Sequence, residues 1–498
     1  MTAPAPSAGS ARRPGPAGAR PGEPFDLLAL FSVLWAAATL FHLFRPSVPL
    51  ALLRLDPESA ANLALCLLAV ALLLRPRSTG LLVALALAQL VEFALSMPVI
   101  SNHYVIAAFL NLAICACFLA LRVRRGPVGA PRQEFFAGWS PVGRHLLLLT
   151  YFLAVFHKLN ADWFDPRVSC AVALTDSLLA PLGLDFPSLD PLVIYGTLAV
   201  EGAAMVLLCM PRWKLLGFAI GMPLHIAIGL VPYSWYPNFS SLSFALYALF
   251  LPEGLPARLE ALVREHPLLL RIPRRLSLRL APSLFLAGAL IAAGTHLLRV
   301  FEDPFAPQDF AVEKRVMHAV LVALWALYSL PIYALFLLLQ RGKPFPASRG
   351  YWWPRPRALA ALSSVFLLNG FAPYLGLQTE GTMSMFSNLH TEGGVTNHLI
   401  LDPPPYLFDY QRKVATILAS SDQRLRRLAD DGLGMVELAL WRHLREHPEA
   451  SLGYRLDGDV QRLARAADAL AAHPQPWLTR KLLAFKDVDF RRPKACSH

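Results

Sequence analysis

The chain of 498 residues is 55% hydrophobic and only 16% charged. A soluble protein of this length needs more polar surface to cover its core, so the composition favours an integral membrane protein. The formal net charge of +12 does not require a nucleic-acid partner, because basic residues that flank membrane helices follow the positive-inside rule. The partner expected from composition is therefore the lipid bilayer.

The segment 1–24 precedes the first apolar run and is rich in Pro, Ala and Gly. This composition predicts a disordered tail. The apolar run that follows begins too late, and is too long, for a cleaved signal peptide. We interpret it as a signal anchor with the tail in the cytoplasm.

Apolar runs then fill most of the chain up to residue 378. A bilayer crossing needs about 20 helical residues, and eleven runs approach that length. They are Phe25–Phe44, Ala60–Leu74, Gly80–Met97, His103–Leu121, Val142–Leu159, Leu192–Met210, Leu215–Val231, Phe239–Leu251, Ser283–Val300, Val316–Leu339 and Leu359–Leu377. We predict an all-α polytopic membrane protein with about eleven transmembrane helices. Two short runs, the second and the eighth, are either packed inside the bundle or are not crossings.

Basic residues alternate in abundance between successive loops. With the N-terminus inside, internal loops carry Arg75, Arg77, Arg122, Arg124, Arg125, Arg132, Arg144, Arg212, Lys214, Arg258, Arg264, Arg271, Arg274, Arg275, Arg279, Arg341, Lys343, Arg349, Arg355 and Arg357. External loops are poorer in Lys and Arg and include Asp56, Glu58, Asp165 and Glu302. This bias agrees with eleven crossings and puts everything after Thr379 outside the cytoplasm.

Histidines show a similar side preference. Those in the outer halves of the predicted helices are His42, His103, His157, His225, His296 and His318. Polar groups within a bilayer are costly and usually face a cavity or each other. We therefore expect a polar cavity that opens outward.

The densest polar cluster ends the fifth predicted crossing at Lys158, followed by Asp162 and Trp163. In one interpretation the lysine reaches the headgroups and Trp163 is an interfacial anchor. In the other, a desolvated Lys158 acts as a general base. Asp162, four residues on, would lie on the same helical face and favour the inert alternative by pairing.

Other candidates lie on neighbouring helices. Asn102 is either an N-cap or part of a polar pair with His103, which could hydrogen-bond a ring oxygen or carboxylate. Glu92 and Glu201 are intramembrane carboxylates and thus functional candidates. His225 follows Pro223, whose interruption of the helix suits a ligand cavity as well as kinked packing.

Metal and redox motifs are weak. His390, Glu392 and His398 could meet across a glycine turn, but their spacing is no metal signature, and we predict no metal site. Cys170 and Cys496 both fall outside, where a disulfide is conceivable but not testable from spacing. The chain has no Walker loop, nucleophile elbow or dinucleotide fingerprint.

The segment 379–498 is polar and charged. Met435–Leu444 and Val460–Ala472 have helical spacing of apolar residues, while Leu399–Leu401 and Ala484–Phe490 look like short extended runs. We predict an α-rich extracytoplasmic region that forms a modest domain or caps the bundle.

A resemblance brings these motifs together. Phe156–Trp163 resembles the K-L-x-A-D-W segment of the vitamin K-dependent gamma-carboxylase and of the wider bacterial horizontally transferred transmembrane (HTTM) family. Asn102-His103 looks like the Asn-His motif of that family. The later part is similar from Glu201 through Pro211-Arg212 and His225 to Phe250-Leu251-Pro252. The likeness covers residues 25–300 and leaves 301–378 as additional transmembrane helices.

The resemblance implies a reaction. In the carboxylase a lysine deprotonates a reduced naphthoquinone, which reacts with oxygen to form the strong base needed before carbon dioxide adds to a glutamate. Carried over, Lys158 is the base and His103 assists carboxylation. The substrate-binding residues would be Asn102, Asp162, Trp163, Glu201 and His225. The cofactors implied are a reduced, vitamin K-like quinone, oxygen and carbon dioxide, in a multi-pass protein of the bacterial inner membrane.

Two functions remain from the sequence. The first is an outward-facing, quinol-dependent oxidation or carboxylation, which would make the chain a carboxylase-like (lyase) or epoxidase-like enzyme. The alternative is a non-catalytic lipid- or quinone-binding membrane protein, or a transporter. Transporters often contain internal repeats, and the two halves of this chain show no clear self-similarity.

Overall fold

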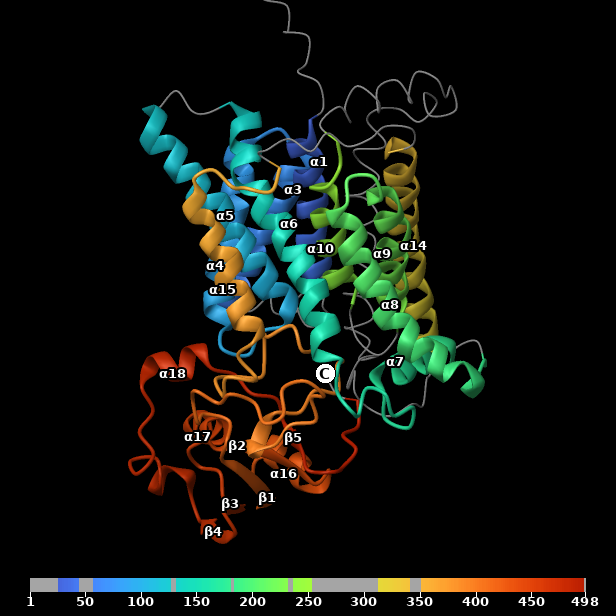
Figure 1. The fold of residues 1–498 in the computed structure, drawn as a ribbon. Helices are drawn as coiled ribbons and strands as arrows, with labels where there is room; N and C mark the ends of the chain where they lie inside the picture. Colours follow the sequence, from blue (N-terminus) through green and yellow to red (C-terminus); the bar gives the residue numbers. More distant parts are fainter. Residues whose placement is uncertain are drawn as a thin grey trace, which may run out of the picture.

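The structure, a computed structural model, describes residues 26–43, 57–126, 131–180, 183–231, 236–252, 312–340 and 351–496. These residues form a helical bundle and a smaller C-terminal domain that lies against one end of it (Figure 1). The predicted tail 1–24 and the predicted crossing Ser283–Val300 fall outside the described residues.

Within the described residues, the bundle contains the α-helices up to residue 370. Its members are α1 (Leu27–Leu43), α3 (Pro57–Leu74), α4 (Thr79–Ser96), α5 (Asn102–Arg125), α6 (Arg132–His157), α7 (Cys170–Leu179), α8 (Asp190–Cys209), α9 (Lys214–Leu230), α10 (Pro237–Ala248), α14 (Val312–Gln340) and α15 (Ala360–Gly370). Each predicted run within the described residues overlaps one of these helices. The short α7 was not predicted.

Three helical segments among the described residues, Thr79–Ser96, Asn102–Arg125 and Pro187–Cys209, are long and apolar enough to cross a membrane. Other apolar helices, such as Leu27–Leu43 and Lys214–Leu230, are shorter. The prediction for Leu359–Leu377 was wrong over its second half, because α15 ends at Gly370 and turns follow. Asn369 explains part of this ending, since its side chain donates to the Gly381 carbonyl at 2.7 Å.

The centre of the bundle is formed by α1, α6 and α10. Nearly all of α1 is buried, as an all-round apolar helix should be. Gly143 of α6 lets α10 approach, because a Cβ there would lie 2.3 Å from Leu249 Cδ1. Gly221 of α9 similarly leaves room for the hydroxyl of Tyr247, which a Cβ would overlap.

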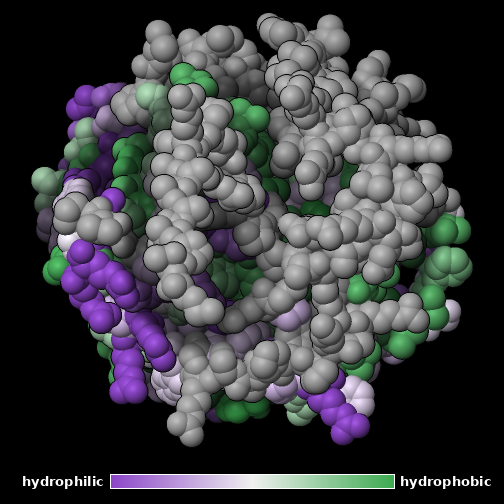
Figure 2. All heavy atoms as spheres, turned by 90° about the horizontal axis from the view of Figure 1, so that it is seen from above, coloured by the Kyte–Doolittle hydropathy of each residue, from purple (hydrophilic) through white to green (hydrophobic). Residues whose placement is uncertain are grey.

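The outer faces of several helices are apolar. Leu67 of α3, Leu119 of α5 and Leu192 of α8 are 62%, 64% and 68% exposed. Viewed from the end opposite the C-terminal domain, hydrophobic residues reach the right-hand rim of the bundle and hydrophilic ones gather on the left (Figure 2). Exposed leucines at this density are compatible with helices that face lipid.

The C-terminal domain is built on an antiparallel five-stranded sheet in the order β4-β3-β1-β2-β5. Its elements are β1 (Val414–Ser420), α16 (Gln423–Asp430), β2 (Leu433–Val436), α17 (Glu437–Glu446), β3 (Leu452–Leu456), β4 (Asp459–Leu463), α18 (Trp477–Leu482) and β5 (Val488–Asp489). A core that includes Leu425, Leu440 and Trp441 joins the helices to the sheet.

This architecture corrects the prediction of an α-rich region. Val460–Ala472 is not a helix: it begins as strand β4 and continues into a 3-10 turn at Ala466–Asp468. The reason is the turn Asp457-Gly458, in which both residues have positive φ. Asp-Gly is a strong hairpin signal, and it pairs β3 with β4. Leu399–Leu401 forms no strand either, whereas Ala484–Phe490 contains β5.

The domain is tied to the bundle end where α6 finishes. Cys170 and Cys496, whose pairing the sequence left open, form a disulfide with Cα atoms 4.8 Å apart. Asn160 and His398 form an isolated antiparallel bridge. The Leu399 amide donates to the Leu159 carbonyl at 2.9 Å. The segment after α6 is therefore covered by the C-terminal part of the chain.

Candidate functional site

Lys158 directly follows α6 and is paired inside the protein. Its ammonium group lies 2.5 Å from both carboxylate oxygens of Glu201, in the middle of α8. Each of the two side chains is less than a tenth exposed. The structure thus pairs Lys158 with Glu201, and not with Asp162, whose pairing would have favoured the inert interpretation.

A tight turn places an aromatic ring against this pair. Asn160 donates to the His157 carbonyl at 2.8 Å and accepts from the Trp163 amide at 2.9 Å. The turn brings the Trp163 ring within 5.1 Å of Lys158 Nζ, a cation–π distance.

Next to the pair lies a short chain of hydroxyl and imidazole groups. The Tyr151 hydroxyl is 2.9 Å from His225 Nε2 and 2.7 Å from the Tyr247 hydroxyl. Glu201 is close enough to Tyr151 to interact with it electrostatically. We call Tyr151, Lys158, Trp163, Glu201 and His225 the lysine cluster.

Two buried polar atoms of the lysine cluster have no hydrogen-bond partner among the described residues: His225 Nδ1 and Trp163 Nε1. The two residues are 3% and 1% exposed. Leaving a buried polar group unsatisfied costs about 1–3 kcal/mol, so a polar partner for either atom would stabilise the protein.

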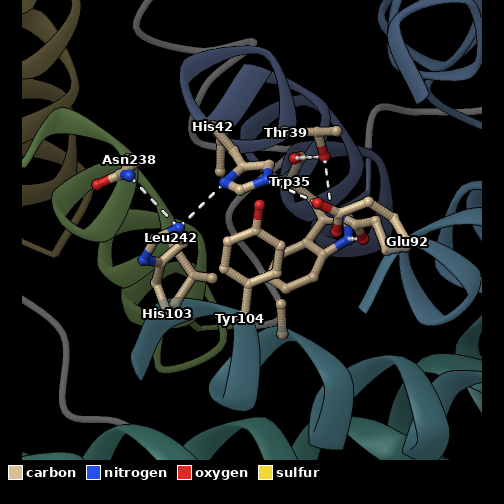
Figure 3. A pocket seen from close by; sticks show the side chains of 11 residues that line it. Trp35, Thr39, His42, Glu92, His103, Tyr104, Asn238 and Leu242 are labelled. Carbon is tan, nitrogen blue, oxygen red and sulfur yellow. Dashed lines mark hydrogen bonds and ion pairs between the residues drawn. The ribbon is translucent and has the colours of Figure 1, made fainter. Parts of the chain in front are cut away.

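His103 belongs to a second set of contacts, between α1, α4, α5 and α10 (Figure 3). Its Nε2 atom is 3.0 Å from His42 Nδ1 and 3.3 Å from Asn238 Nδ2. The other nitrogen of His42 is 3.4 Å from Glu92 Oε1. We call Glu92, His42, His103 and Asn238 the histidine cluster.

The histidine cluster lines a cavity together with Trp35, Thr39, Gln89 and Tyr104. Gln89 connects two other lining residues, because it accepts a hydrogen bond from Trp35 Nε1 at 2.9 Å and donates one to Thr39 Oγ1 at 3.0 Å. The free volume of about 30 Å³ is enough for water. An aromatic ring would fit only after side chains move. As it stands, the cavity can pass protons along a carboxylate and two imidazoles.

Both clusters lie toward the end of the bundle that meets the C-terminal domain. His42 is in the last turn of α1, whereas His103 and Asn238 are the second residues of α5 and α10. His42 and His103 thus share one end of the bundle, and the side of a membrane that this end faces stays a prediction.

Two predicted site residues contact the C-terminal domain instead of a cluster. Asn102 accepts from the Met383 amide at 2.8 Å. Asp162 accepts from Asn397 Nδ2 at 2.8 Å and from the Lys494 amide at 3.1 Å. Both residues are buried. Because they hold the C-terminal part of the chain against the bundle, we call these interactions the docking contacts.

The glycine turn after His390 does not bring the three suggested ligands together. His390 Nδ1 is 3.6 Å from Glu392 Oε2, but His398 Nε2 bonds the Phe156 carbonyl at 3.0 Å. Burial alone would raise the pKa of Glu392, but Lys494, His390 and the Thr391 amide together hold it below its usual value. Burial lowers the pKa of His390. The segment is a loop that contacts the bundle through His398 and in which His390 lies beside the Glu392 carboxylate.

Sequence reasoning missed Tyr151, Tyr247 and Asn238. All three lie within apolar or weakly polar helices, where a single hydroxyl or amide resembles ordinary packing. Asn238 alone had a usable signal. Proline favours the first position of a helix, so Pro237 places Asn238 at the start of a helix and hence at one end of the bundle.

Comparisons with family models, with curated proteins and with solved structures gave no match. The likeness of Phe156–Trp163 to the carboxylase segment thus remains a hypothesis from the motif alone.

Proposed function

We propose that this chain is a multi-pass membrane protein that binds a reduced quinone and oxidises it, or uses it for a carboxylation, at the lysine cluster. The observation that carries the proposal is the buried ion pair between Lys158 and Glu201. Each buried ion costs several kcal/mol in desolvation. A bundle gains nothing in packing from such a pair, and intramembrane charges are functional candidates by default.

The pair can supply a base. An ammonium group has no lone pair, so Lys158 accepts a proton only after giving one to Glu201, which lies 2.5 Å away. The amine and the carboxylic acid that result are each uncharged, so the low-dielectric site then holds no formal charges. Lys158 can then take a proton from an acidic hydroxyl, such as that of a reduced quinone, which supplies the electrons for the reaction with oxygen.

Neighbouring residues fit the binding of such a hydroxylated ring. His225 Nδ1 and Trp163 Nε1 are buried polar atoms in need of partners. The Trp163 ring offers an apolar face beside Lys158. The histidine cluster offers a separate route for protons, with His103 at its end near Asn238.

The proposal includes an extracytoplasmic site with about eleven crossings. It is supported by the alternation of basic loops, by the exposed leucines on α3, α5 and α8, and by the disulfide between Cys170 and Cys496. Disulfides persist in oxidising compartments such as the bacterial periplasm.

The test uses the full chain in lipid nanodiscs with a chemically reduced naphthoquinone. Turnover is followed by quinone absorbance and oxygen consumption. We expect Lys158→Met to lower the rate by about 10²–10⁴-fold, the usual contribution of a positioned base. Lys214→Met is the matched control, because Lys214 is another buried lysine, 3.8 Å from the Tyr351 ring, and its rate should stay within a few-fold of wild type.

Equal turnover in Lys158→Met and the wild type would remove Lys158 from the mechanism. Absence of turnover with any reduced quinone, together with a quinone that co-purifies and is identified by mass spectrometry, would favour the non-catalytic binding protein.

A further inference from the structure

Three side chains of the C-terminal domain converge at the ends of two helices. Asp422 is the N-cap of α16, His443 lies in the last turn of α17, and His447 is the C-cap of α17. The two histidines are four residues apart, so their rings lie on one face with centroids 4.5 Å apart. One ligand atom from each of the three residues lies within 4.8 Å of the others.

The carboxylate offers one oxygen to each ring. His443 Nε2 is 2.9 Å from Asp422 Oδ1, and His447 Nδ1 is 3.8 Å from Asp422 Oδ2. Zinc bonds of about 2.0–2.2 Å in a tetrahedron keep ligand atoms roughly 3.3–3.6 Å apart. Side-chain movements of about 1 Å would therefore complete this geometry.

Asp422 is already held in position. Its Oδ1 atom accepts from the Leu425 amide at 2.9 Å. His443 Nε2 lies 2.9 Å from the same oxygen. These two contacts fix the carboxylate at the start of α16.

Access to the three residues is open from one side. The side chains of Asp422 and His443 are 11% and 10% exposed, whereas that of His447 is 49% exposed. The hydrogen bond between Asp422 and His443 alone would explain two buried residues. It does not explain a second imidazole one helical turn further on, directed at the same carboxylate and reachable from solvent.

We propose that Asp422, His443 and His447 bind one divalent transition-metal ion, with water in the fourth position. Imidazole and carboxylate together suit zinc, and also cobalt, nickel and copper. A bound ion would fasten the start of α16 to the end of α17. The inference does not rest on the proposed quinol chemistry.

The experiment uses the full chain in detergent, freed of metal by a chelator. Cobalt titration reports tetrahedral coordination by its visible absorption, and equilibrium dialysis against zinc with elemental analysis gives the stoichiometry. We expect one zinc per chain, and a higher melting temperature when zinc is added.

Two variants test the ligands. His447→Ala leaves the Asp422–His443 bond in place and should weaken zinc binding by more than about tenfold, since even outer-shell changes cost roughly 10- to 100-fold. Asp422→Ser retains an N-cap residue but removes the carboxylate, and should have a similar effect. His473→Ala is the matched control, because it removes a histidine that stacks on Trp441 elsewhere in the domain.

Equal zinc affinity in His447→Ala and His473→Ala would overturn the proposal, as would a wild-type chain that retains no metal after dialysis. These readouts are metal content and melting temperature, so neither outcome depends on quinol turnover.

Discussion

The lysine cluster and the docking contacts come from neighbouring parts of the sequence but do different work. Lys158 turns into the bundle and pairs with Glu201. Asp162, only four residues later, turns away and accepts hydrogen bonds from Asn397 and Lys494. The segment Phe156–Trp163 therefore contains two separate features: a buried ion pair at Lys158, which we propose as the reactive group, and an anchor for the C-terminal domain at Asp162. Changes to the two should separate in experiment.

The largest effect is expected from breaking the ion pair. Glu201→Leu leaves Lys158 buried and alone, which should destabilise the bundle by about 3–5 kcal/mol. The double variant Lys158→Met with Glu201→Leu should recover most of that loss, because it replaces the pair by apolar groups. Denaturant unfolding of the purified protein measures both. If Glu201→Leu alone were as stable as the double variant, the pair would not be a buried one. In both variants we expect the protease resistance of the C-terminal domain to be unchanged.

The second largest effect is expected from removing the disulfide. The double variant Cys170→Ser with Cys496→Ser should weaken the attachment of the C-terminal domain to the bundle by about 2–4 kcal/mol, since the bond joins positions 326 residues apart. Limited proteolysis should release the C-terminal domain faster. A reducing agent should have the same effect on the wild type and none on the variant. Sensitivity of the variant to reduction would show that the bond is not the cause.

Removing a docking acceptor is expected to have a smaller effect. Asp162→Ala leaves the buried Lys494 amide without its acceptor, which should weaken docking by about 1–3 kcal/mol. The matched control is Arg167→Ala in the same loop. Its side chain is 78% exposed and pairs with Asp165, and an exposed ion pair contributes little to stability. Proteolysis rates of the two variants measure the difference. Equal rates would argue against a docking role for Asp162.

The smallest effect is a pH dependence of docking at Glu392. The folded pKa of Glu392 lies below that of the unfolded chain, so its stabilisation is fully present above the unfolded pKa, about 4.3. That stabilisation is lost as the pH falls through the folded pKa. Glu392→Gln should flatten this part of the stability profile, measured by unfolding between neutral and acid pH. An unchanged profile would contradict the ionised state of Glu392.

The helices of the bundle were predictable because apolar runs longer than about 10–12 residues exceed the length of ordinary strands and favour helices. The partner of Lys158 was not, because Glu201 lies 43 residues away on another helix. The expectation that Asp162 shares a helical face with Lys158 failed for a local reason: α6 ends at His157, and the Asn160 turn follows. Periodicity says which residues share a face only while the helix continues.

In the C-terminal domain the turn chemistry was more informative than the apolar spacing. Val460 and Leu463 suit a helix by spacing, yet Asp457-Gly458 makes them part of a hairpin. His443 and His447 were within reach of sequence reasoning, since histidines at this spacing on a helix share a face. The position of Asp422 beside these histidines was not predictable, because it depends on how α16 packs against the sheet.

The segment around Cys496 covers the loop that follows Lys158. The Lys494 amide donates to Asp162, and Cys496 is bonded to Cys170, 326 positions earlier in the chain. This covering can therefore form only after the segment around Cys496 has been synthesised, long after the helices that carry Lys158 and Glu201. Reduction of the disulfide would loosen the covering and leave the Lys158–Glu201 pair in place.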